Sequence, residues 1–145
     1  MTTVKACLSQ KPTQLIQVAP GEPVQRALEL MKGNRVRSVL VLEGDRLAGI
    51  ITQGDCAIRV LLNGLDARTT PVSQIMTPDP MTVKPSDQLE ACMGLMASRN
   101  IRHLPVLESG RVVGVVSIGD IVKDMIRQLG EQVSYLETYI KGHGA

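Results

Sequence analysis

The stretch GIITQGD at residues 49–55 recurs as GVVSIGD at residues 114–120, and this recurrence decides the fold. Shifting the sequence by 65 positions lays residues 16–55 on residues 81–120 without a gap, and twelve of the forty pairs are identical. Most other pairs at apolar positions exchange one aliphatic residue for another. Self-similarity over this length predicts two copies of one structural unit.

The residues before the motif predict a strand and then a helix in each copy. A short apolar strand at residues 15–18 or 81–83 ends at Pro20 or Pro85, because proline cannot continue a ladder of hydrogen bonds. An amphipathic helix follows, in which apolar residues recur at i, i+3, i+4 and i+7. These residues are Val24, Ala27, Leu28 and Met31 in the first copy and Leu89, Cys92, Met93 and Met96 in the second.

Each copy then continues into a β-hairpin and a second helix that begins near Asp55 or Asp120. Aliphatic and β-branched runs around a Gly-containing turn are typical of hairpins. At the first helices, Pro23 suits the first turn, and we expect Ser86 or Asp87 to cap the helix of the second copy. The paired runs lie at residues 39–42 and 47–51, and again at 104–107 and 112–116.

We therefore predict an α/β (α+β) fold of two strand-helix-strand-strand-helix repeats packed about a pseudo-twofold axis, with Val41 and Val106 in the core. A unit of about sixty residues is marginal alone, so the repeats should share an interface. The tail residues Val133, Leu136, Tyr139 and Ile140 form one apolar helix face, which predicts a homodimer. The expected boundaries are 8–65 for the first repeat, 66–80 for a linker with a short helix near 72–76, 81–130 for the second repeat and 131–145 for a separate C-terminal helix and tail.

Composition excludes several classes of protein. The 145 residues are 43% hydrophobic and 21% charged, values that are ordinary for a folded domain. The chain has no Trp or Phe, so it lacks the aromatic platforms on which single-stranded nucleic acids stack. No apolar run approaches the ~20 residues that span a bilayer. From these two observations we expect no nucleic-acid partner and no membrane partner. Because Cys7, Cys56 and Cys92 are odd in number and far apart, we expect a reducing cytoplasmic location.

The repeated motif places a hydroxyl at the end of a strand and a carboxylate three residues later, at the start of a helix. The free N–H groups and the dipole of a helix start favour an anion such as phosphate. A carboxylate suits a vicinal diol, as acidic residues do with ribose in dinucleotide folds. The same residue types also serve as simple helix caps. The matching Arg37 and Arg102 upstream favour a nucleotide, because caps alone do not require them.

This arrangement, together with Arg102-His103-Leu104-Pro105-Val106, resembles a tandem pair of cystathionine β-synthase (CBS) domains, also called a Bateman module, over residues 8–129. The tail YLETYIKG at residues 135–142 further resembles that of stand-alone bacterial two-CBS signalling proteins. The resemblance implies a regulatory protein rather than an enzyme, with no required cofactor. It also implies an adenosine ligand such as AMP, ADP, ATP, NAD(H) or S-adenosylmethionine, a flat homodimer and an unknown target protein.

The resemblance also implies the roles of particular residues. Asp55 and Asp120 would hold ribose hydroxyls, and Thr52 and Ser117 would bind ribose or phosphate. The backbone at Arg37, Ser38 and Val39, and at Arg102, His103 and Leu104, would meet adenine or phosphate. Apolar side chains of the first strands would pack on adenine, and basic side chains would neutralise phosphate. The apolar set is Ile16, Val18, Met81 and Val83, and the basic set is Arg37, Arg102, His103, Arg59 and Lys123.

The two copies differ where the ligand would bind. Ser38-Val39-Leu40 in the first copy aligns with His103-Leu104-Pro105 in the second. In addition, many relatives place charged residues where this chain has Gln53-Gly54. We expect the cleft with Ser117 and Asp120 to bind phosphate more tightly, because it has more neighbouring cations.

Other chemistries have little support in the sequence. His103 and His143 do not lie at metal-ligand spacing from Cys or carboxylate residues, so no metal site is expected. No phosphate-binding loop, dinucleotide fingerprint or nucleophile elbow occurs. The alternative function is a protein-interaction module that dimerises and docks on a target without any ligand.

Overall fold

The computed structural model describes residues 2–143, and its elements follow the predicted order except for the first strand of the second repeat. The short helix expected near 72–76 is confirmed as Val72–Ile75, and two elements are additional, a helix near the N-terminus and a strand between the repeats. In chain order the elements are α1 (Val4–Leu8), β1 (Gln17–Val18), α2 (Val24–Asn34), β2 (Ser38–Glu43), β3 (Arg46–Thr52), α3 (Gln53–Asp55), the π-helix η1 (Cys56–Leu61), α4 (Val72–Ile75), β4 (Thr77–Pro78), α5 (Leu89–Arg99), β5 (His103–Glu108), β6 (Arg111–Ser117) and α6 (Ile118–His143).

The first repeat forms a four-stranded sheet in the order β1-β2-β3-β4. Strand β1 pairs parallel to β2, and β2 and β3 form the predicted antiparallel hairpin. Strand β4, which lies in the expected linker, pairs antiparallel to β3. The linker therefore does more than connect the repeats, because it completes the sheet of the first one.

The second repeat keeps the hairpin but not the full first strand. Strands β5 and β6 pair antiparallel, whereas the strand expected at residues 81–83 is reduced to a single parallel bridge between Val83 and Val106. In the first repeat, Leu40 N–H donates to Ile16 O at 3.0 Å. The equivalent residue in the second repeat is Pro105, which has no N–H to donate. The prediction of a strand at 81–83 was therefore wrong because one donor of the ladder is missing.

The caps of the first helices also differ from the prediction. Pro23 is the N-cap of α2 rather than a residue of its first turn, and Gln88, not Ser86 or Asp87, is the N-cap of α5. The Asp87 carboxylate instead accepts from the N–H of Lys84 at 2.8 Å. It closes the turn before the helix and is therefore not available to the helix N–H groups.

The two faces of each hairpin contribute apolar residues to two places, the core of the repeat itself and the interface between the repeats. Val41 and Val106, predicted as core, are fully buried and belong to two separate clusters beneath the helices of their own repeats. Successive residues of a strand point to opposite faces. Leu40 and Ile50 are thus buried outside the cluster of the first repeat and line the space between the repeats, where β3 contacts β6. The two repeats share this sheet interface, as predicted for a pseudo-twofold pair.

The segment that precedes each repeat packs on the other repeat. Val4 N–H donates to Asp87 O at 2.8 Å, and Val4 and Cys7 join the core of the second repeat. In the same way, Val72 N–H donates to Glu22 O at 2.8 Å, and Val72 and Ile75 join the core of the first repeat. The two segments are therefore structural equivalents at an offset of 68 residues. These contacts hold the two repeats together, because each repeat packs on the segment that precedes the other.

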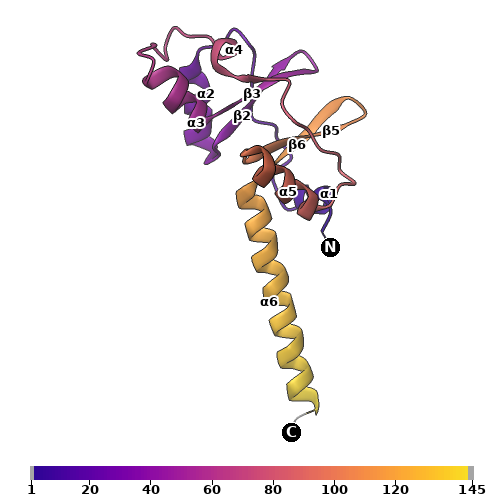
Figure 1. The fold of residues 1–145 in the computed structure, drawn as a ribbon. Helices are drawn as coiled ribbons and strands as arrows, with labels where there is room; N and C mark the ends of the chain where they lie inside the picture. The colour runs from indigo at the N-terminus through magenta and orange to yellow at the C-terminus, as the bar shows by residue number, and fades with distance from the viewer. Residues whose placement is uncertain (1, 144–145) are drawn as a thin grey trace.

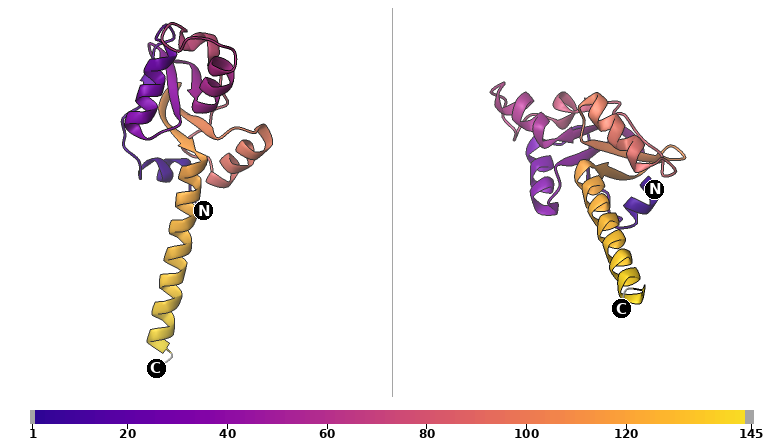
Figure 2. Two further views of the ribbon diagram at one scale, coloured as in Figure 1. Left: turned by 90° about the vertical axis from the view of Figure 1, so that its left-hand side faces the viewer. Right: turned by 60° about the horizontal axis from the view of Figure 1, so that its bottom comes forward.

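Helix α6 is one continuous element of 26 residues. The second helix of the second repeat runs through Gly130 into the tail, so that helix and the expected C-terminal helix form one element. Figures 1 and 2 show that most of α6 projects from the body formed by the two repeats. Among residues 2–143, no helix has the combination of length and apolarity needed to cross a membrane.

Candidate functional site

The hairpins bring the predicted site residues to equivalent places in the two repeats. Ser38 pairs with Thr52 at the end of the β2–β3 hairpin, and His103 pairs with Ser117 at the end of the β5–β6 hairpin. The carbonyl of the preceding arginine accepts the first N–H of the following helix, from Gln53 to Arg37 O at 3.0 Å and from Ile118 to Arg102 O at 2.9 Å. Each arginine is therefore held beside a strand-to-helix junction.

Each junction is closed by a reciprocal pair of hydrogen bonds. The Asp55 N–H donates to Thr52 Oγ1 at 3.1 Å, and the Thr52 N–H donates to Asp55 Oδ2 at 3.0 Å. Ser117 and Asp120 make the same pair of bonds at 3.1 and 2.8 Å. These are capping boxes, so the interpretation of both motifs as helix caps is correct. A ligand at either junction would use the acceptor capacity that the caps leave free.

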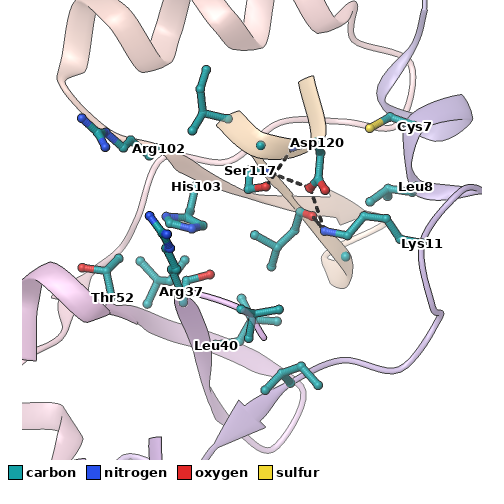
Figure 3. Close-up of a pocket in the computed structure, with 18 of the residues that line it drawn as sticks. Cys7, Leu8, Lys11, Arg37, Leu40, Thr52, Arg102, His103, Ser117 and Asp120 are labelled. Atoms are coloured by element: carbon teal, nitrogen blue, oxygen red, sulfur yellow. Dashed lines mark hydrogen bonds and ion pairs between the residues drawn. The ribbon is translucent and has the colours of Figure 1, made fainter. Parts of the chain in front are cut away.

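Both junctions open into one cavity of about 1760 Å³ between the repeats. Figure 3 shows Arg37 and His103, which come from different hairpins, next to each other in this cavity, with Ser117 and Asp120 at a second side of it. Eleven of the sixteen residues predicted from the sequence line the cavity. They are Ile16, Arg37, Ser38, Thr52, Asp55, Met81, Arg102, His103, Ser117, Asp120 and Lys123.

The other five predicted residues do not line the cavity. The side chains of Val18, Val39, Val83 and Leu104 are buried in the cores of their own repeats, on the opposite face of the strands. Val18 and Val83, predicted to pack on adenine, lie in these cores instead, whereas Ile16 and Met81 line the cavity. The partly exposed Arg59 donates from Nη1 to Ile75 O at 3.2 Å. It therefore stabilises the end of α4.

Sequence reasoning missed the residues that the connecting segments bring to the cavity, of which Lys11 is the most important. Lys11 Nζ donates to Asp120 Oδ2 at 2.8 Å and to Val115 O at 2.7 Å. Arg35 and Asn100, the left-handed C-caps of α2 and α5, also line the cavity. Thr2 and Thr70, with Val4 and Val72, repeat at an offset of 68. This match at an offset of 68 residues predicts that the segment before Lys11 packs on the second structural repeat, as the segment around Val72 packs on the first.

The cavity has an excess of positive charge. Seven Lys and Arg side chains line it, against the three carboxylates of Asp55, Asp120 and Asp124. Burial lowers the pKa of His103 below its ordinary value, and the nearby Lys11, Arg102 and Arg37 lower it further, while Asp120 opposes them. His103 is therefore neutral at neutral pH. It can donate or accept a hydrogen bond but does not contribute the charge that the sequence analysis assigned to it.

Of the three cysteines, Cys7 lines the cavity, whereas Cys56 and Cys92 do not. All three thiols are free and buried, and burial raises the pKa of Cys56 and of Cys92 to about 11. Burial also raises the pKa of Cys7. Thiols with raised pKa values are poor nucleophiles at neutral pH. Within residues 2–143, no cluster of three or more His, Cys, Asp or Glu residues is arranged to hold a metal ion.

Comparison with known proteins identifies the class to which this fold and cavity belong. The family model of the CBS domain matches the chain twice, over residues 11–61 and 72–127. The chain therefore belongs to the CBS-domain family and carries a tandem pair of these domains.

Individual relatives support the same assignment. The CBS domain-containing protein YhcV of Bacillus subtilis is 36% identical over 121 residues, which cover 83% of this chain and 84% of YhcV. A protein with CBS domains from Burkholderia ambifaria, proposed to act in signal transduction, is 39% identical with a TM-score of 0.84, covering 87% of this chain and 95% of that one. The CBS domain protein PAE2072 from Pyrobaculum aerophilum, solved as a complex with AMP, shares the fold at 24% identity and a TM-score of 0.74, covering 82% and 89% of the two chains.

Proposed function

We propose that this protein is a regulatory module that binds an adenosine nucleotide in the cavity between its repeats and acts through a target protein. The observation that carries the proposal is the pair of equivalent junctions in one cationic cavity. Each junction combines a hydroxyl, a carboxylate and an arginine carbonyl in the same geometry. Capping explains the hydroxyl and the carboxylate but not the shared cavity or its excess of cations.

The carboxylates retain the capacity to hold ribose. The caps use Oδ2 in both aspartates. Oδ1 of Asp55 lies 3.8 Å from Arg59 Nε, too far for a hydrogen bond, and none of the hydrogen bonds within residues 2–143 engages Oδ1 of Asp120. An ionised carboxylate offers about four lone-pair sites. Each aspartate can therefore cap its helix and accept from a ribose hydroxyl at the same time.

We expect the phosphate to bind more tightly on the side of Ser117 and Asp120. Arg102 and Lys123 line that side, and Lys11 adds a cation that the sequence analysis did not include. On the side of Thr52 and Asp55, Arg37 lines the cavity, and Arg59 donates to the end of α4 and pairs with Asp55 at 3.8 Å without lining the cavity. Charge-assisted hydrogen bonds are roughly twice as strong as neutral ones. We therefore propose the same ranking, with Lys11 rather than His103 as the third cation.

The cavity and the fold both support an adenosine nucleotide as the ligand. Ligand pockets commonly measure roughly 300–1,000 Å³, so a cavity of about 1760 Å³ has room for AMP, ADP, ATP or NAD(H). The AMP complex of PAE2072 is an example of a CBS fold that accommodates an adenosine nucleotide.

The proposal extends to a homodimer in a reducing, cytoplasmic environment. Ile58 and Leu61 on η1, and Leu62 at its C-cap, are more than 60% exposed, which is unusual for neighbouring apolar residues of a lone chain. A dimer that covers η1 would remove them from water. The three free cysteines suit a reducing compartment.

Thermal unfolding in the presence of adenosine compounds tests the proposed function. A ligand at 100 times its dissociation constant adds about 2.7 kcal/mol to the free energy of unfolding, which corresponds to an increase in Tm of roughly 5–10 °C for a chain of this size. AMP, ADP, ATP, NAD(H) and S-adenosylmethionine are compared with inorganic phosphate and with guanosine nucleotides. If no adenosine compound raises the Tm, the ligand-independent interaction module replaces this proposal.

A further inference from the structure

Among residues 2–143, His103 is the only histidine that lines the cavity, and cations surround it. It lies at the start of β5, where it pairs with Ser117 on β6. Arg37 approaches it from the other repeat (Figure 3), Arg102 precedes it in the chain, and Lys11 belongs to the segment that follows α1. Three cations from three different segments therefore face this imidazole.

This setting holds His103 in its neutral form when the cavity contains no ligand. Burial and the nearby Lys11, Arg102 and Arg37 all lower the pKa of His103, and Asp120 alone opposes them. The charge of Asp120 is partly compensated, because its Oδ2 lies 2.8 Å from Lys11 Nζ. A neutral imidazole has one ring nitrogen without a proton. The cavity therefore contains a proton acceptor among its cations.

An anionic ligand would reverse the balance of charge around His103. A phosphate monoester carries a charge of about −1.5 to −2 at neutral pH. Held between Arg37 and Arg102, a phosphate would compensate the cations that keep the imidazole neutral and would add negative charge of its own. An opposite charge within ~4–6 Å favours the charged form of a titratable group. Both changes raise the pKa of His103, and the imidazolium can donate from both ring nitrogens.

We propose that His103 takes up a proton when the phosphate of an adenosine nucleotide enters the cavity, so that the protein binds the nucleotide more tightly as the pH falls. The inference rests on the proposed function, because it requires a phosphate in this cavity. The coupling is reciprocal, since a proton and a nucleotide each raise the affinity for the other. The affinity rises as the pH falls through the pKa of His103 in the complex and levels off below its pKa in the free protein.

Proton uptake also selects the class of ligand. A phosphate stabilises the imidazolium of His103, whereas adenosine has no charge with which to do so. S-adenosylmethionine carries a positive sulfonium, which would disfavour the imidazolium and adds to the excess of cations in the cavity. We therefore expect adenosine phosphates to be bound in preference to the nucleoside and to the sulfonium compound.

Nuclear magnetic resonance titration of the imidazole ring protons tests proton uptake directly. The sequence has two histidines, His103 and His143, so the His143→Gln variant leaves the signals of His103 alone. We expect the midpoint of their pH titration to rise when AMP saturates the protein and to stay constant when adenosine is added. A helix or strand contact of His103 without a phosphate would not produce this difference. A midpoint that stays constant or falls on addition of AMP would overturn the proposal.

Calorimetry measures the consequence for affinity. AMP is titrated at pH 6.0 and 7.5 into the parent protein, into His103→Gln and into the matched control His143→Gln. The phosphate of AMP itself titrates in this range, and it does so equally with every variant. We expect the gain in affinity between pH 7.5 and 6.0 to be about threefold larger for the parent and for His143→Gln than for His103→Gln.

The proposed function and the proton uptake fail in different ways. If AMP gives no saturable heat with the parent protein at either pH, the proposed nucleotide site is wrong for AMP and the proton uptake is overturned with it. If AMP binds but the gain in affinity is the same for the parent and for His103→Gln, the nucleotide site stands and the proton uptake alone is overturned.

Discussion

Lys11 Nζ lies 2.8 Å from Asp120 Oδ2, so a residue in the segment that precedes β1 contacts the helix start of the second repeat. Lys11 also reaches Val115 O at the end of β6. At the offset of 68 residues that relates the connecting segments, the equivalent of Lys11 is Asp79. The two repeats are therefore related in fold but not in charge at this position, because a cation contacts the junction at Asp120 and its equivalent, Asp79, is an anion.

Lys11→Met is expected to lower the free energy of unfolding by about 1 kcal/mol. Ion pairs that are partly exposed stabilise by roughly 0–1 kcal/mol, and the Lys11 side chain is 31% exposed, but its second bond to Val115 O is also lost. Lys11→Arg, which keeps the charge, is the control. Urea unfolding measures the effect, and a Lys11→Met variant as stable as the parent protein would show that this contact does not hold the connecting segment.

Gly49→Ala is expected to destabilise the protein more than the equivalent Gly114→Ala. A Cβ at Gly49 would lie 2.7 Å from the backbone oxygen of Thr77 and 2.6 Å from Met76 Sδ. A Cβ at Gly114 would lie 2.8 Å from Leu8 Cδ2, the end of a flexible side chain. Overpacking of this kind typically costs about 1–3 kcal/mol. We expect the upper part of that range for Gly49→Ala, and equal losses in denaturant unfolding would argue against the crossed packing of α1 and α4.

The repeat could be predicted from the sequence because both copies contain the same local structural motifs. Hairpins, amphipathic helices and capping residues depend on neighbours in the chain, and Gly49 and Gly114 recur with the motif around them. The packing of α1 on the second repeat and of α4 on the first depends instead on contacts between segments that are far apart in the sequence. Its trace in the sequence is the short match of Thr2, Val4 and Pro12 to Thr70, Val72 and Pro80.

The candidate site was predicted in part for the same reason. Asp55 and Asp120 line the cavity because the motif fixes them at the junctions. Val18 was assigned to the wrong face, because a strand of two residues gives too little alternation to determine which side meets the helix. Lys11 could not be assigned from its own repeat, since its partner lies in the other one.

Acidification is expected to destabilise the protein through His103. Its pKa is lowered in the folded state, so the unfolded chain binds a proton that the folded protein does not. Stability due to neutral His103 is therefore present above the unfolded value of 6.5 and is lost as the pH falls through that value toward the folded pKa. His103→Gln removes this contribution. The difference in unfolding free energy between parent and variant should change between pH 7.5 and 5, and a constant difference would contradict the burial of His103.

Calorimetric titration of adenosine nucleotides tests the central claim most directly. Asp55→Asn and Asp120→Asn each keep an oxygen that can cap the helix but replace one ribose-accepting oxygen with a donor. AMP, ATP and NAD(H) are titrated into the parent protein and into each variant. We predict saturable binding to the parent, loss of the tighter event in Asp120→Asn and a weaker effect of about tenfold or less in Asp55→Asn. The absence of saturable heat for all three nucleotides, or unchanged affinity when both aspartates are replaced, would contradict the account.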